Sequence, residues 1–123
     1  MKIFRFRDWQ VYKDARNFRK DLIKDIAPQI KQTKSFALQD QLERALVSIV
    51  LNIAEGAYRK TKKDFAKFLN QAITSVNEVV ACLDLCLDDD IIDNKLHNKY
   101  LKRADFLIKQ LNSFVKSLLK DSN

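Results

Sequence analysis

The sequence predicts an all-α protein, an antiparallel up-and-down four-helix bundle. Apolar side chains recur at spacings of three and four over long stretches, as on one face of a helix. The 123 residues include one glycine and one proline, too few for hairpin turns or glycine-rich phosphate-binding loops. The connections between the apolar stretches are short, as in such bundles. The length suits one domain, so we expect residues 1–123 to form a single bundle.

The first two helices are predicted from apolar periodicity and from the proline. The first is expected over residues 8–27 and ends before Pro28, because the residue before a proline is biased away from the α region. A polar connection is expected over residues 29–35. The second helix is expected over residues 36–58, with Gly56 in its last turn, where the low helix propensity of glycine matters least.

The third helix is expected over residues 62–89, because Thr61 and Asp64 have the spacing of a capping pair. The fourth is expected over residues 94–120. Four aspartates lie between these helices: Asp88, Asp89, Asp90 and Asp93. They are interpreted as capping groups, with two alternatives: a divalent cation site, for which the spaced ligands of an EF-hand are missing, and an acidic tip that meets the basic start of the third helix in a neighbouring copy.

The second helix carries more apolar surface than one buried stripe requires. Beside its expected core face lies a second apolar face, which consists of Val47, Val50, Leu51, Ala54 and Tyr58. Either this helix sits centrally beneath loops, or its second face packs against another copy of the chain. We expect self-association, because exposed apolar patches of this size usually mark interfaces.

The charge is basic and partitioned along the chain. The 23 Lys and Arg against 16 Asp and Glu give a net charge of +7, which favours RNA or DNA as a partner ahead of a membrane surface. Two basic groups are the candidate nucleic-acid contacts. The first surrounds the start of the third helix and comprises Arg59, Lys60, Lys62, Lys63 and Lys67. The second forms a ridge along the fourth helix and comprises Lys95, Lys99, Lys102, Lys109 and Lys116.

Lysine rows of this kind contact phosphates and give little base selectivity; the alternative is that they only keep the protein soluble. The Lys and Arg residues of the first helix are interleaved with Asp14, Asp21 and Asp25, which is typical of ion pairing on a solvated helix.

The sequence predicts no catalytic or metal site and no cofactor. His97, the single histidine, is expected on the surface, and Cys82 and Cys86 share one helix without a second pair of ligands. Glu55 and Arg59 have the spacing of a surface ion pair. An RNA-processing activity through Glu55 or His97 would need a nucleophile and an orienting group, and the sequence places none beside them. The cysteine usage favours the cytoplasm, and no stretch is apolar enough to span a membrane.

A motif in the second helix carries a family resemblance. The run from Gln41 to Ala45 precedes Ser48-Ile49 and the run from Asn52 to Gly56. Its polar and glycine positions are Arg44, Ser48, Asn52, Glu55 and Gly56. With Trp9-Gln10 upstream, this pattern resembles the bacterial proteins encoded in intervening sequences of 23S ribosomal RNA genes, which are related to accessory proteins of diversity-generating retroelements.

The resemblance implies a four-helix bundle that assembles as a ring-shaped homopentamer and has no known catalytic activity. Through the related accessory proteins it also implies binding to nucleic acid and to a reverse transcriptase. We therefore expect a non-enzymatic homo-oligomeric scaffold that binds the RNA or DNA backbone. The alternative is an interaction module for a protein partner such as a retroelement reverse transcriptase.

Overall fold

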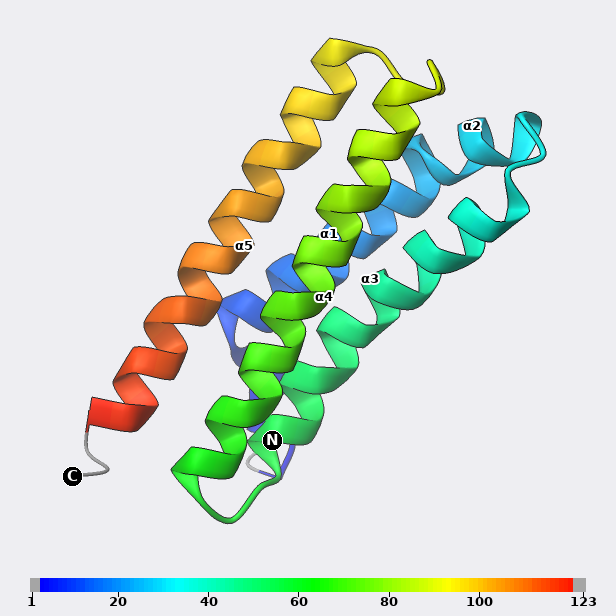
Figure 1. Cartoon of the computed structure of the whole chain (residues 1–123). Helices are drawn as coiled ribbons and strands as arrows, with labels where there is room; N and C mark the ends of the chain where they lie inside the picture. Colours follow the sequence, from blue (N-terminus) through cyan, green and yellow to red (C-terminus); the bar gives the residue numbers. More distant parts are fainter. Residues whose placement is uncertain (1–2, 121–123) are drawn as a thin grey trace.

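The computed structural model describes residues 3–120, and each of its elements in that range is helical. In chain order these are the 3-10 helix η1 (Arg5–Asp8), α1 (Gln10–Asp25), α2 (Ala27–Gln32), α3 (Phe36–Ala57), α4 (Lys62–Asp88) and α5 (Asn94–Lys120). The helices α3, α4 and α5 run up and down beside one another, and α1 packs against α3 and α5 (Figure 1). The predicted four-helix bundle is confirmed, with α2 as a short addition.

The first predicted helix differs most from the structure. Trp9 has an extended backbone, so α1 begins after it, and α1 ends at Asp25. Pro28 lies in the first turn of α2, where the missing backbone N–H costs nothing. The polar connection predicted over residues 29–35 is therefore wrong in its first half, because α2 continues there and buries Ile30 completely.

The other three helices lie within one residue of their predicted bounds, and two of them begin at side-chain caps. The Thr61 hydroxyl accepts the backbone N–H of Asp64 at 3.1 Å, as the capping pair predicted. The Asp93 carboxylate accepts the backbone N–H of Leu96 at 2.8 Å. The capping interpretation is thus confirmed for Asp93.

An aromatic cluster closes the core where α1 begins, α4 begins and α5 ends. Trp9 stacks on Phe65 with ring centroids 5.6 Å apart, and Phe114 lies edge-on to both, each at 5.1 Å. The Phe65 ring of this cluster also packs against Gly56 at the end of α3. A Cβ added to Gly56 would lie 2.8 Å from Phe65 Cδ1 and 3.0 Å from Phe68 Cβ. The position near a helix end therefore explains only part of the occurrence of glycine at residue 56. The packing of α4 also leaves no room there for a side chain.

We expect Gly56→Ala to lower the free energy of unfolding by about 1 kcal/mol, because overpacking costs about 1–3 kcal/mol and alanine returns about 1 kcal/mol of helix propensity. Urea denaturation measures this change. The matched control is the same substitution in a Phe65→Leu background, where the smaller side chain gives more room and Gly56→Ala should cost less. An equal cost in both backgrounds, or increased stability, would contradict the packing explanation.

Candidate functional site

The basic group at the start of α4 is exposed to solvent. Its members Arg59, Lys60, Lys62, Lys63 and Lys67 surround the α3–α4 turn. The Arg59 guanidinium lies 4.3 Å from the centre of the Phe68 ring and 3.9 Å from the Glu55 carboxylate, which confirms the predicted pair. The start of α4 and the end of α5 lie at the same end of the bundle (Figure 1).

The lysine ridge runs along the outer face of α5. Lys95, Lys102, Lys109 and Lys116 are all exposed, and they span about 32 Å at 1.5 Å per residue. Lys109 pairs with Asp105 within the helix at 2.9 Å. Only the Lys109 and Lys116 end of the ridge approaches the basic start of α4, while Lys95 lies at the opposite end, beside the acidic α4–α5 turn.

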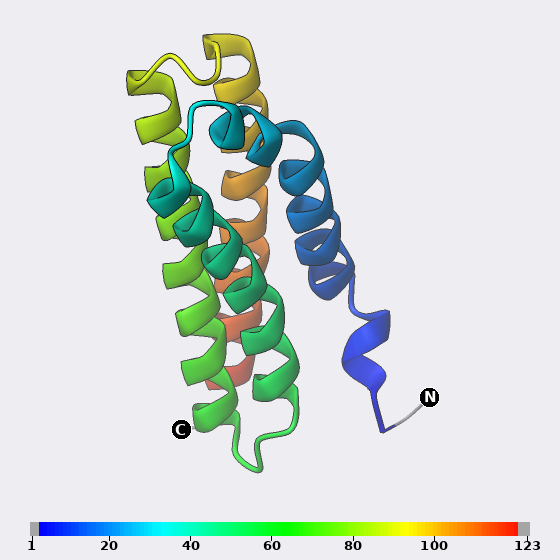
Figure 2. The same ribbon diagram turned by 90° about the vertical axis from the view of Figure 1, so that its right-hand side faces the viewer.

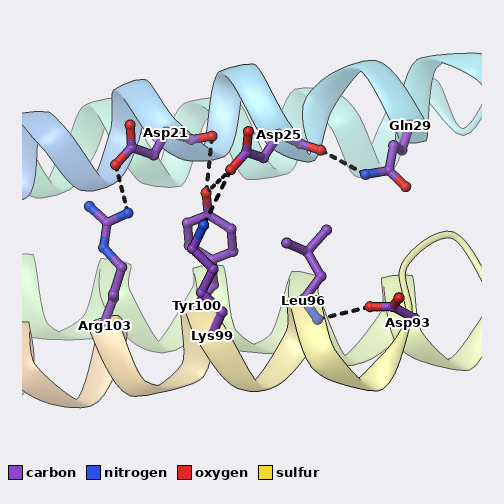
Figure 3. Close-up of polar contacts among 8 residues, drawn as sticks. All are labelled: Asp21, Asp25, Gln29, Asp93, Leu96, Lys99, Tyr100 and Arg103. Atoms are coloured by element: carbon purple, nitrogen blue, oxygen red, sulfur yellow. Dashed lines mark hydrogen bonds and ion pairs between the residues drawn. The ribbon is translucent and has the colours of Figure 1, made fainter.

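Carboxylates of α1 are bound by α5 along a polar seam, which Figure 3 shows. Asp21 accepts from the Arg103 guanidinium at 2.7 Å, and Asp25 accepts from the buried Tyr100 hydroxyl. That hydroxyl also lies 3.3 Å from the backbone carbonyl of Asp21. Two further contacts cross the seam, those of Gln110 with Asp14 and of Lys99 with Asp25. The expectation that these carboxylates pair within a solvated helix is wrong, because α5 offers them donors. Lys99 accordingly faces α1.

Burial raises the pKa of the Tyr100 hydroxyl above its ordinary value of 10.0, and the hydrogen bond to the Asp25 carboxylate raises it further. Arg103 acts in the opposite direction on this pKa, with a smaller effect. Tyr100 is thus a neutral donor at physiological pH.

Cations of α1 line a groove against α3, on the side away from the seam. We call this the basic groove: it encloses about 600 Å³ and is lined by Lys13, Arg16, Asn17, Arg19, Lys20, Val47, Val50 and Leu51. This groove was not predicted from the sequence, because the charges of α1 were interpreted as ion pairs within one helix. The signal was present in the spacing, since Asp14, Asp21 and Asp25 fall on one helix face while Arg16 and Arg19 fall on another.

The second apolar face of α3 remains largely uncovered. Val47, Leu51 and Tyr58 are 37%, 56% and 89% exposed, while Val50 and Ala54 are half-buried. Within residues 3–120 no loop covers the three exposed side chains, so the alternative of a central helix beneath loops is wrong for them. The cleft beside the end of this face is lined by further apolar residues, Ile3, Phe4 and Phe6.

The polar positions of the motif are divided between separate contacts. Asn52 donates to the Ser48 carbonyl and hydroxyl at 2.8 and 3.0 Å, and the Ser75 hydroxyl donates to the Ser48 hydroxyl at 2.8 Å. This network joins α3 to α4. Arg44 instead pairs with Asp40 at 3.1 Å. Ser48 and Asn52 therefore have a structural role in the helix interface, and Arg44 does not belong to a common cluster with them.

His97 is buried, contrary to expectation, because the first turn of α5 packs against α4. Its Nε2 lies 2.8 Å from the Asp84 carboxylate. Cys82 and Cys86 are buried free thiols. Burial raises the pKa of both thiols, that of Cys86 to about 11, so neither is a thiolate nucleophile at neutral pH. In the described part of the chain, no three His, Cys, Asp or Glu side chains are placed to hold a metal ion.

None of the described helices combines the length and the apolar character needed to cross a membrane.

Comparisons with known proteins give one family and one fold. A family model described as 23S rRNA-intervening sequence protein matches residues 7–113. A solved structure of a protein of unknown function from the S23 ribosomal protein family of Bacteroides thetaiotaomicron is similar, with a TM-score of 0.80 and 24% identity over 86% of this chain and 98% of that chain. At that identity the likeness supports the fold alone. No curated protein matches the chain.

We expect Tyr100→Phe to lower the free energy of unfolding by about 1–3 kcal/mol, because it removes a buried hydrogen bond to a carboxylate. Tyr12→Phe is the matched control, since its half-buried ring keeps its contacts with Phe6 and Arg16. Equal losses for the two variants would contradict a specific role for the seam.

The effect of Tyr100→Phe should also depend on pH. The raised pKa in the folded chain means that the contribution of Tyr100 to stability is complete below the unfolded-state pKa of about 10 and declines as pH rises above it. The stability difference between wild type and Tyr100→Phe should therefore shrink above pH 10 in denaturation series. A difference that stays constant there would contradict this linkage.

Proposed function

The chain belongs to the family of 23S rRNA-intervening sequence proteins, and we propose that it is a non-enzymatic, self-associating scaffold that binds the backbone of RNA or DNA. The observation that carries this proposal is the placement of two surfaces. The uncovered apolar face belongs to α3 and the lysine ridge to α5, and Figure 2 shows α5 behind α3 across the bundle. Copies that associate through α3 leave the lysines of α5 accessible.

Self-association is supported by the exposure of Val47, Leu51 and Tyr58 on one helix face. Single exposed apolar residues are ordinary on protein surfaces, but a contiguous group of this kind is typical of interfaces. The family resemblance favours a ring of five copies. Such a ring would carry five times the net charge of +7 of one chain, and its pooled field would attract polyanions more strongly than one copy does.

Phosphate binding is supported by the exposed cations at the start of α4 and on α5. Lys60, Lys63, Lys102 and Lys116 are exposed and have no carboxylate partner within the described residues. Lysines of this kind bind phosphates as point charges, without reading base edges. The expected ligand is therefore an RNA or DNA of broad sequence range.

A second candidate function is that of an interaction module for another polypeptide, such as a reverse transcriptase. The apolar cleft between the N-terminal segment and the end of α3 supports it. This cleft encloses about 330 Å³ beside Phe4, Ala54 and Tyr58, which suits an apolar side chain of a partner. This function predicts weak nucleic-acid binding by the protein alone and a large gain when the partner is added.

We expect Leu51→Glu to weaken self-association by at least about 1.5–3 kcal/mol, because it removes the burial of a leucine side chain and requires a carboxylate to lose its hydration. Light scattering at two protein concentrations measures the mass. Lys102→Glu is the control: it changes charge on the far side of the bundle and should leave the assembly intact. A wild-type protein with the mass of a single chain at both concentrations would refute self-association.

We expect binding to a labelled structured RNA to weaken steeply between about 50 and 200 mM salt, because each phosphate that a lysine neutralises releases counterions. Lys102→Glu with Lys116→Glu should weaken binding and reduce the salt dependence. Lys24→Glu with Lys31→Glu makes the same charge change outside both basic groups and should have a smaller effect. Absence of binding at about 50 mM salt would refute the nucleic-acid function.

A further inference from the structure

We propose that the basic groove of one copy holds an acidic, apolar corner of a second copy, an interaction that rests on the self-association proposed above. The acidic corner comprises Phe36 at the start of α3 and Leu85, Asp88 and Asp89 at the end of α4. These two helix ends lie together at one end of the bundle (Figure 1).

The basic groove offers cations for which the described residues supply no anionic partner. Lys13, Arg16, Arg19 and Lys20 lie within about two turns of α1, and none of the described residues that line the groove is acidic. The carboxylates of α1 that would neutralise these cations are held by α5 instead. Opposite the cations lie the exposed apolar side chains of Val47 and Leu51. The groove thus suits a ligand that is both anionic and apolar.

The acidic corner has the complementary character. Phe36 and Leu85 are 62% and 51% exposed, and with Asp89 they line one shallow pocket. Lys34 is the single cation among the residues that line this pocket. Asp88 and Asp89 lie at the C-terminal end of α4, where their charges oppose the helix dipole. Cations from a second copy would relieve this unfavourable placement.

A ring requires that each copy present two different surfaces that match each other. The groove and the corner meet this requirement, because they are opposite in charge and each carries exposed apolar side chains. Contact between them would cover Phe36 and Leu85 with Val47 and Leu51 and would bring Asp88 and Asp89 to the cations of α1.

Charge reversal on each surface tests the pairing. Arg16→Glu with Lys20→Glu reverses the groove, and Asp88→Lys with Asp89→Lys reverses the corner. Both pairs of side chains are exposed, and lysine suits the end of α4, so the variants should fold; circular dichroism melts check this. Sedimentation at a concentration at which the wild type is assembled should show single chains for each reversed pair. The variant with all four substitutions should assemble again.

Lys24→Glu with Lys31→Glu is the matched control, since it makes the same charge change outside the groove and should leave the assembly intact. Assembly by either reversed pair, or single chains for the fourfold variant beside an assembled wild type, would overturn the pairing while self-association stands. A wild type that never assembles would overturn both. Loss of RNA binding by the groove variant, with assembly unchanged, would assign the groove to nucleic acid and overturn the pairing as well.

Discussion

The binding of α1 carboxylates by α5 is the interaction on which the surface properties of this molecule depend. The Tyr100 hydroxyl is fully buried and needs an acceptor, which Asp25 supplies, and Arg103 adds an ion pair with Asp21. These contacts fix the rotation of α1 about its own axis. They also divide α1, a helix of mixed charge, into two sides. The carboxylates of the acidic side bind α5, and the cations of the basic side, with Arg16 and Arg19, line the basic groove.

The helix α3 is constrained from two directions at once. Its core face packs beneath α1 and α4, and the close approach to α4 at Gly56 depends on the absence of a side chain there. Its outer face presents Val47, Leu51 and Tyr58 to solvent. The outer face of α3 is not covered by another helix within the described residues. Its extra apolar side chains, Val47 and Leu51 among them, therefore form an exposed surface next to the cations of α1. The basic groove is the product of these two neighbouring helices.

Most of the fold could be predicted because its signals are local. Helix periodicity and the Thr61 and Asp93 caps each act within a few residues, so three helices have their predicted bounds to within one residue. The helix α2 was missed because Pro28 was interpreted only as a helix end, and because the burial of Ile30 follows only from packing in the folded bundle. His97 was placed on the surface for the same reason, since only the packing of α5 on α4 brings it to Asp84.

The sequence by itself determined the fold class, the apolar surplus of the second helix and the presence of exposed lysine rows, since each follows from composition and helical spacing. The tertiary structure alone decided which charges are neutralised. An aspartate pairs with whichever donor the fold brings within hydrogen-bonding distance, and for Asp21 and Asp25 those donors lie some 75 to 82 residues away along the chain. Spacing along one helix therefore cannot distinguish a solvated ion pair from a carboxylate that binds a neighbouring helix and leaves its own cations free.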